Sequence, residues 1–339
     1  MPRAKVFACR KAKEGPNVRV SADVERIVDA ALEGARPTHS ELVHLASLDA
    51  YSLDAAYTIW AGRTLTAKAS NGVAEIHAQV GMDANPCPDN CLFCSFAAVN
   101  TNRTGRMEMP VEQVIAYAKA YIEQGANCLT FMVTSNYDFG QYVDYLAQVR
   151  EAVGPSMPLC ANMGDFTFAQ AQRLKAAGVG SVYHAVRNGE GVLTNIPLER
   201  RFESIHAAQE AGLKVLTCLE LCIPRFSEEE IVTNMERVLD CRTEYAHAGS
   251  LVRVPGTAMQ DEPVHTLAKR NLYKAVMRLG AGTKSRFGCG NLTWAEVGTN
   301  PRDHSNETEK TGIASSVDKI RRRFESEGWK TYRGPSPWW

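Results

Sequence analysis

The sequence predicts an α/β fold, a (β/α)₈ barrel of the TIM type, complete or nearly so, with an N-terminal helical extension. From residue 73 onward, short apolar segments alternate with amphipathic ones, which gives about eight strands with helices between them. Several of the helical segments stop at a glycine and lead through a short loop into the next strand, as in parallel sheets. A chain of 339 residues also suits one such barrel with appendages better than two ordinary domains.

The first 70 residues are predicted to be the helical extension. Apolar residues at positions 24, 27, 28, 31 and 32 follow the spacing of one helix face, and Ser21 stands at the N-cap position. Two further helices are expected to begin near residues 40 and 53.

The barrel is predicted to span residues 71–328. Its first strand, residues 73–81, alternates in the manner of a half-buried strand. The other strands are expected at residues 128–133, 158–163, 179–186, 214–223, 249–254, 284–287 and 291–297. The helices between and after them are expected at residues 110–123, 142–153, 167–177, 198–211, 228–237, 268–279 and 313–327. In the remaining tail, residues 329–339, Trp338 and Trp339 are expected to pack back on the barrel.

Composition narrows the classes of function. The chain is 45% hydrophobic and 22% charged, with zero formal net charge, so bulk electrostatics favour neither nucleic acid nor an anionic membrane. No apolar run approaches the roughly 18 residues of a membrane span, and the first residues lack the apolar region of a signal peptide. We therefore expect a cytoplasmic protein that binds neither membrane nor nucleic acid, whose ten cysteines are thiols and metal ligands rather than disulfides.

The most informative motif directly follows the first predicted strand. Cys87, Cys91 and Cys94 have the spacing C-x₃-C-x₂-C, and no fourth ligand lies close by. Three thiolates on so short a loop fit an iron–sulfur cluster with one iron left open to a small molecule. The alternatives are a zinc loop, which would want a fourth Cys or His nearby, and a disulfide pair.

These residues resemble the radical S-adenosylmethionine (SAM) superfamily, which has an aromatic residue just before the third cysteine, as Phe93 is here. The segments 160–164, 170–178, 210–215 and 251–259 resemble its biotin synthase branch. That branch includes biotin synthase, the HydE-type hydrogenase maturase, methylornithine synthase and the HmdB-type cofactor enzymes. The resemblance covers most of residues 20–330.

The resemblance implies a 4Fe–4S cluster on the three cysteines and SAM chelated to its open iron. Phe93 would lie near the adenine, and the polar patch for the methionyl amine would be Thr134, Ser135 and Asn136. Residues 183–188 stand where biotin synthase has polar residues near the ribose and the substrate; among them His184 is a candidate cofactor contact, and the alternative is a satisfied polar residue. Ala185 and Arg187 replace the Asn and Asp of biotin synthase, so Arg187 or Glu190 is expected to contact the SAM carboxylate or ribose instead.

A second metal site is an open question in the sequence. Biotin synthase holds a second cluster with three strand cysteines and an arginine; Cys160 and Arg286 match two of these, whereas Thr130 and Leu216 occupy the other positions. Along the predicted strand 214–223, alternation would place Leu216, Cys218, Glu220 and Cys222 on one face. The hypothesis is an auxiliary site of Cys160, Cys218, Cys222 and Arg286; the alternative is that these cysteines fill the core.

The predicted substrate contacts are Glu220, Asn162, Arg286 and Glu296, all near strand ends. For Glu296 a structural ion pair is the alternative. The resemblance implies a radical enzyme that abstracts hydrogen from a small molecule in biosynthesis, with an electron donor such as flavodoxin or ferredoxin. Rearrangement, fragmentation or carbon transfer is favoured over sulfur insertion of the biotin synthase kind. A rival of another class is a non-catalytic iron–sulfur electron carrier or scaffold.

Overall fold

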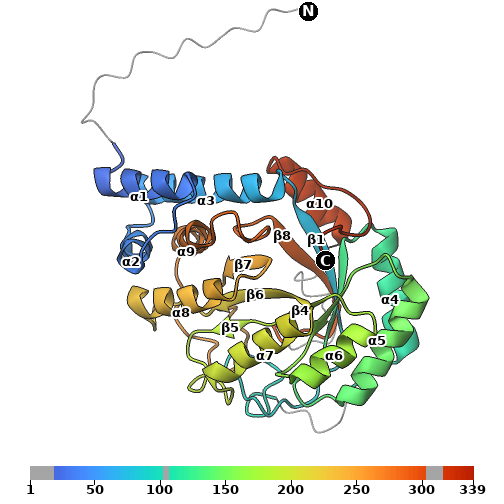
Figure 1. Cartoon of the computed structure of the whole chain (residues 1–339). Coiled ribbons are helices and arrows are strands. Elements are labelled where there is room, and N and C mark those ends of the chain that lie inside the picture. The colour runs from blue at the N-terminus through green and yellow to red at the C-terminus, as the bar shows by residue number, and fades with distance from the viewer. Residues whose placement is uncertain (1–18, 102–106, 303–315) are drawn as a thin grey trace, which may run out of the picture.

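The computed structural model describes residues 19–101, 107–302 and 316–339, and within them it has one parallel sheet wrapped by helices (Figure 1). The strand segments are β1 (Glu75–Gly81), β2 (Cys128–Met132), β3 (Leu159–Asn162), β4 (Ser181–Tyr183), β5 (Val186–Arg187), β6 (Lys214–Glu220), β7 (Tyr245–Ala248) and β8 (Leu292–Gly298). Each lies within or close to a predicted strand, except that the predicted strand 249–254 is displaced to β7.

Three helices precede β1: α1 (Ala22–Leu32), α2 (His39–Ser47) and α3 (Leu53–Ser70). These helices begin close to the residues at which the sequence predicts helices, and residues 1–18 of the predicted extension lie outside the described residues. The other helices are α4 (Val111–Glu123), α5 (Phe139–Val153), α6 (Phe168–Ala176), α7 (Leu198–Glu210), α8 (Glu228–Asp240), α9 (Leu267–Ala281) and α10 (Val317–Ser326). Capping boxes at Thr38, Thr167 and Ser227 fix the starts of α2, α6 and α8.

The sheet is an open, partial barrel. From one edge to the other, the strand order is β7, β6, β4/β5, β3, β2, β1, β8. The short strands β4 and β5 share one position because both pair with the same side of β6. Among the described residues the edge strands β7 and β8 do not pair with each other; a single bridge joins Tyr245 to Phe287. The predicted barrel is therefore confirmed as a parallel α/β half-barrel, but the prediction of complete or nearly complete closure is not. The segment 284–287, predicted as a strand, contributes only this bridge.

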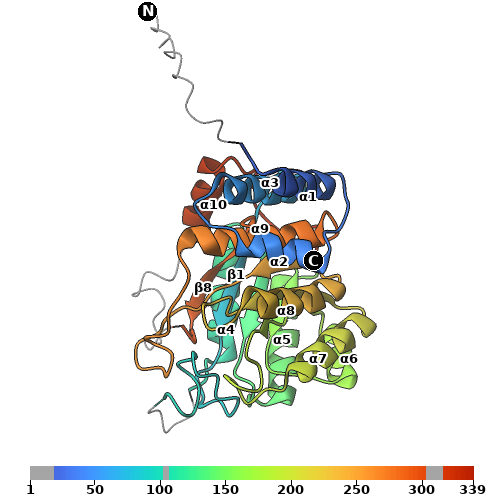
Figure 2. The same ribbon diagram turned by 90° about the vertical axis from the view of Figure 1, so that its left-hand side faces the viewer.

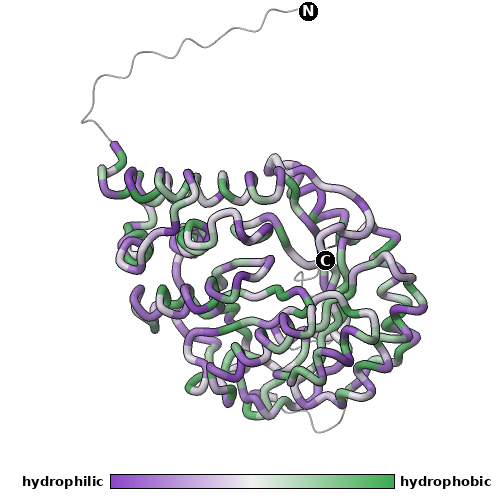
Figure 3. Tube along the Cα trace, in the orientation of Figure 1, coloured by the Kyte–Doolittle hydropathy of each residue, from purple (hydrophilic) through white to green (hydrophobic). Residues whose placement is uncertain are grey.

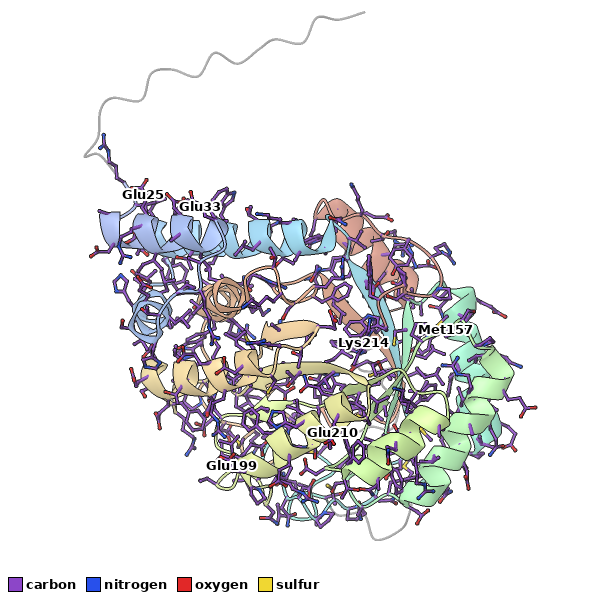
Figure 4. The ribbon with its side chains drawn as sticks, viewed as in Figure 1. Glu25, Glu33, Met157, Glu199, Glu210 and Lys214 are labelled. Carbon is purple, nitrogen blue, oxygen red and sulfur yellow. The ribbon has the colours of Figure 1, made fainter. Side chains whose placement is uncertain are left out.

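Helices α1 to α3 lie over α9, on the side of the molecule where the sheet is open (Figures 1 and 2). The loop after β1, blue-green in Figure 2, hangs on the opposite side from α1 and α3. Apolar residues concentrate in the strands and on the inner helix faces (Figure 3), whereas the exposed side chains of Glu25, Glu33, Glu199 and Glu210 point outward (Figure 4).

Alternation along the strands sorts residues into two cores. On β1 the apolar residues Ile76, Ala78 and Val80 belong to the large core between sheet and helices. The residues between them face the barrel interior, where a separate cluster forms. Its buried members are Cys128, Cys160, Ala185, Leu216, Cys218, Tyr245, Phe287 and Leu292.

The C-terminal tail closes the base of the barrel. The carboxylate of Glu75, buried at the start of β1, accepts hydrogen bonds from the hydroxyl of Ser336 (2.6 Å), the indole N–H of Trp339 (2.8 Å) and the hydroxyl of Tyr332. Burial alone would raise the pKa of Glu75, but its hydrogen bonds, with His77 among the partners, hold that pKa below its ordinary value.

The two terminal tryptophans pack on the barrel, as predicted. The ring of Trp339 stacks on Phe287, with centroids 5.5 Å apart. The Nζ of Lys214, at the start of β6 (Figure 4), donates to the carbonyl of Trp338.

Candidate active site

The three motif cysteines lie on one tight loop, residues 85–97, which we call the cysteine loop. A parallel bridge between Cys87 and Ala97 closes it, with the N–H of Cys87 2.8 Å from the carbonyl of Phe96. Asn90 turns the chain with φ of 46°, a left-handed conformation that asparagine tolerates better than most residues. The loop is thus preformed by its own backbone.

Asn100 holds the loop from one side. Its side-chain amide donates to the carbonyls of Leu92 (3.1 Å) and Cys94 (3.0 Å) and lies 3.5 Å from that of Cys91. Its side-chain oxygen accepts the N–H of Ala258 at 3.2 Å. One amide therefore joins the cysteine loop to the chain beyond β7.

Hydrogen-bond donors and a positive charge surround the thiols. The N–H of Phe96 lies 3.3 Å from the sulfur of Cys94, and the hydroxyl of Ser135 lies 3.1 Å from that of Cys87. Burial raises the pKa of Cys91 to about 12 and that of Cys94 to about 11, while the charge of Arg187 opposes both shifts. Such donors and such a cation are what thiolates bound to an iron–sulfur cluster require, so these residues fit that group.

Arg187 connects the cysteine loop to a chain of buried charges. Its guanidinium lies 5.5 Å from the ring centroid of Phe93 and forms ion pairs with Glu220 (3.0 Å) and Glu190 (3.1 Å). Burial opposes the charge, but Glu220 and Glu190 raise the pKa of Arg187 above its ordinary value. Glu190 also pairs with Arg201 at 3.4 Å. Arg187 therefore stays charged and fixed beside Phe93 and Cys91.

The predicted polar patch mainly braces the loop. The N–H and the hydroxyl of Thr134 both donate to the buried carboxylate of Asp83, at the end of β1. The exposed Asn136 donates to the carbonyl of Pro86 at 3.0 Å. Burial raises the pKa of Asp83 despite these donors. The sequence reasoning missed Asp83, although an aspartate two residues past a buried strand was a usable signal.

No group of three His, Cys, Asp or Glu side chains within the described ranges is arranged to hold a single metal ion. In the same ranges, no helix is both long and apolar enough to cross a membrane.

Comparison with known proteins adds to this geometry. Residues 84–238, which contain the cysteine loop, match the model of the radical SAM superfamily. Residues 84–238 form a radical SAM domain.

Curated relatives of this domain include two bacterial biotin synthases. That of Methylobacterium radiotolerans is 29% identical over 222 residues, covering 59% of this chain and 64% of the relative. The biotin synthase of Neorickettsia sennetsu is 26% identical over 215 residues, covering 59% of this chain and 66% of the relative. The chain thus spans just under two thirds of the length of these relatives.

Solved structures with a similar fold include a methylornithine synthase and a hydrogenase maturase. Methylornithine synthase superposes with a TM-score of 0.72 at 14% identity, over 91% of this chain and 97% of its own. HydG, a maturase of the [FeFe]-hydrogenase, superposes with a TM-score of 0.71 at 12% identity, over 91% of this chain and 76% of HydG. The partial parallel barrel of this chain is therefore similar in fold to those two proteins.

A polar layer crosses the barrel interior at the end of the strands nearest the cysteine loop. The side-chain amide of Gln79 on β1 donates to Glu296 at 3.3 Å, and its oxygen accepts from Asn162 at 3.2 Å. Glu296 also forms an ion pair with Arg302 and accepts from Asn300 at 2.9 Å. Glu296 therefore forms the structural ion pair that the sequence offered as an alternative role, and its partner in the polar layer is Arg302.

Glu220 occupies the opposite side of this layer. Its carboxylate accepts from the hydroxyl of Tyr183 at 3.2 Å and pairs with Arg187, yet its side chain keeps 30% of its surface exposed. A carboxylate inside a barrel that remains partly open is available to a further cationic or hydrogen-bonding group.

An aromatic layer lies beneath the polar layer, and its centre is Trp294 of β8. The indole N–H donates to Thr130 at 3.2 Å, and the ring makes edge contacts with His77 (5.7 Å), Tyr183 (5.5 Å) and Tyr245 (5.7 Å between centroids). These partners come from four different strands, so one side chain fills the middle of the barrel. Sequence reasoning placed Trp294 in a strand but did not predict that its side chain faces inward.

The four residues of the predicted auxiliary site do not come together. Cys160 and Cys218 face the interior, but the prediction that Cys222 shares the face of Cys218 is wrong. The strand ends at Glu220, and Leu221 takes φ of 60°, which breaks the alternation and turns Cys222 into the core between sheet and helices.

Arg286 also lies elsewhere than predicted. Its guanidinium stacks on Trp338, 3.6 Å from the ring centroid, and donates to the carbonyl of Ala69 at the end of α3. Phe287 is the residue that enters the interior, so its neighbour points away from it. This position corrects both predicted roles of Arg286, as a metal ligand and as a substrate contact.

His184 faces the helix layer rather than the cysteine loop. Its Nε2 lies 2.9 Å from Asp165 and 3.1 Å from Arg201, and its ring packs edge-on against Phe166. Burial and the charge of Arg201 lower its pKa to about 4. The structure therefore places His184 at the far end of the charge chain from Arg187, away from its predicted cofactor contact.

Proposed function

We propose that this chain is a radical SAM enzyme acting on a small organic molecule. Cys87, Cys91 and Cys94 hold a 4Fe–4S cluster whose fourth iron binds SAM. When bound, these groups supply a 5′-deoxyadenosyl radical that abstracts a hydrogen atom from the substrate. The support is the superfamily match over residues 84–238 together with the donors around the three sulfurs.

The chain's own residues hold and orient the reactants. Arg187, fixed between Glu190 and Glu220, presents its remaining N–H groups and its charge beside Phe93, where an anionic or hydroxyl group of SAM would lie. Asn162 and Glu220, in the polar layer, supply the substrate contacts. Glu296 holds Arg302 and Asn300 at the edge of that layer. The aromatic layer below them keeps water away from the reacting atoms.

The reaction is a rearrangement, fragmentation or carbon transfer rather than sulfur insertion. The observation that carries this proposal is Trp294, whose indole occupies the interior beside Thr130, the position where the resemblance expects a cluster cysteine. Leu216 occupies a second such position and is fully buried. Protein interiors are close-packed, so an indole at this level supports a reaction that does not use a second cluster among the same strands.

The remaining expectations follow from this reaction class. The cleavage of SAM needs one electron, so a small redox protein such as flavodoxin or ferredoxin is the proposed partner. The proposed compartment is the cytoplasm, where reduced thiols persist, and zero net charge favours no nucleic-acid partner.

Anaerobic reconstitution with iron and sulfide tests the proposal. We expect about four irons per chain, and 5′-deoxyadenosine from SAM with a strong chemical reductant. Cys160→Ala and Cys218→Ala should keep the parent's iron content, whereas Cys94→Ala should lose it. Two to four extra irons that disappear in Cys160→Ala would instead support sulfur insertion, and intact clusters without 5′-deoxyadenosine would support the electron carrier.

A further inference from the structure

A stripe of cations runs along the open side of the barrel. Arg270, Lys274 and Arg278 recur every four residues on α9, so they lie on one face of that helix. Helix α9 packs against β7 and α3, where β7 and β8 fail to pair. We call this region, between β7, α9 and residues 285–289, the β7–β8 seam.

Arg278 is the most unusual member of the stripe because it is 0% exposed. Its Nη1 donates to the carbonyls of Ser285 (2.6 Å) and Gly282 (3.2 Å), which braces the end of α9. Its Nε and Nη2 have no hydrogen-bond partner, and neither does the buried Nε of Arg270. The Nη2 lies beside the backbone at Gly288, where a Cβ would come within 2.9 Å of it.

No carboxylate of the described chain forms an ion pair with any of the three cations. Three titratable groups face the three cations across the seam: the thiol of Cys289, the phenol of Tyr245 and the imidazole of His247. Arg63 on α3 and Arg323 on α10 add further positive charge. Burial lowers the pKa of Arg278 to about 10 and also lowers that of Lys274. The seam is therefore positively charged and incompletely hydrogen-bonded.

A buried guanidinium without a counter-charge is costly, and proteins ordinarily pair such groups. The donors left open here, Nε and Nη2 of Arg278 with the ammonium of Lys274 one turn away, match the oxygens of a carboxylate or phosphate. The His247 Nδ1 also lacks a partner and lies within the field of both cations.

We propose that the β7–β8 seam binds a small oxyanion, a carboxylate or phosphate group, through Arg278 and Lys274. The ligand is small because α3 and α9 are in close contact here: a Cβ on Gly62 would come within 2.8 Å of Ala275. This site lies outside the cysteine loop and stands whether or not the proposed reaction is correct.

Inorganic phosphate is the probe. With the full-length chain at constant ionic strength, we expect a saturable rise in melting temperature with phosphate that sodium chloride does not reproduce. Lys274→Met should weaken the apparent affinity at least about tenfold, the effect of removing one charge-assisted contact. Lys119→Met, which removes an exposed lysine from α4, should bind phosphate as the parent does.

A crystal soaked with selenate locates the anion even if Arg278→Met fails to fold. We expect an anomalous selenium peak beside Arg278, with a selenate oxygen within hydrogen-bond distance of Nη2. Ordered water alone at this position, equal phosphate affinity in the parent and Lys274→Met, or selenate only at exposed side chains would each overturn the proposal.

Discussion

Replacing Trp339 with alanine should destabilise the barrel from its base. The substitution removes the indole N–H that donates to the buried carboxylate of Glu75 at 2.8 Å. It also removes the stacking on Phe287 and the edge contact with His77, whose centroids both lie 5.5 Å away. A hydrogen bond to a charged group contributes about 1.5–3 kcal/mol, and each aromatic pair about 0.5–1.5 kcal/mol.

These contributions predict a loss of about 3–5 kcal/mol in the free energy of unfolding, in the range of other buried aromatic truncations. A chain of this length has an unfolding entropy of about 0.7 kcal/mol/K, so the melting temperature should fall by about 4–7 °C. Differential scanning calorimetry or chemical denaturation followed by circular dichroism measures the change.

Two variants separate the contributions. Trp339→Phe keeps an aromatic ring against Phe287 but removes one of the two partners of a Glu75 oxygen, the other being His77, so it should cost about 1–3 kcal/mol. Trp60→Ala removes a tryptophan that is 52% exposed on α3 and should change stability by less than about 1 kcal/mol. If Trp339→Ala proved no more harmful than Trp60→Ala, the tail would not be the closure that the structure indicates.

Three further results are expected. Cys222→Ala should retain the iron content of the reconstituted parent, measured by colorimetric iron analysis, because its sulfur lies in the helix-side core; iron loss equal to that of Cys94→Ala would contradict this placement. Asn100→Ala should release iron to a chelator several-fold faster than the parent, since its amide braces two loop carbonyls; an unchanged rate would show that the loop holds itself. Because the folded-state pKa of His184 is about 4, below the unfolded 6.5, the unfolded chain binds more protons between these values. Stability should therefore fall by up to about 3 kcal/mol as pH drops from 6.5 to 4, and urea titrations of His184→Gln should show a smaller decline; equal slopes would refute the assignment.

The periodic parts of the fold were predictable because local sequence determines them. Apolar spacing located the helices before β1, and alternation located β1 itself within two residues. Closure of the sheet was not predictable, because it depends on whether β7 and β8 meet. The segment 284–287 had the composition of a strand but forms one bridge only, at Phe287.

In the candidate site, too, the features that local sequence determines were predictable and those that depend on tertiary contacts were not. The cysteine loop was recognisable from the spacing of Cys87, Cys91 and Cys94, which is a local property. Cys222 was misplaced because strict alternation was extended through Leu221, where a positive φ ends it. The contact of Trp294 with Thr130 and that of Asn100 with Ala258 join residues more than 150 positions apart, which no local pattern reveals.

The tail also affects when the barrel can become complete. Glu75 receives its donors from residues 257, 261 and 264 positions later in the chain, so its burial joins the first strand to a segment more than 250 residues away. Contacts this distant in sequence form slowly, because the chain between the two residues loses conformational entropy before the contact can stabilise the fold. Until residues 332–339 are in place, the carboxylate of Glu75 lacks these donors and must remain hydrated, so the base of the barrel stays open. Closure of the barrel base is therefore expected to be a late step in the folding of this chain.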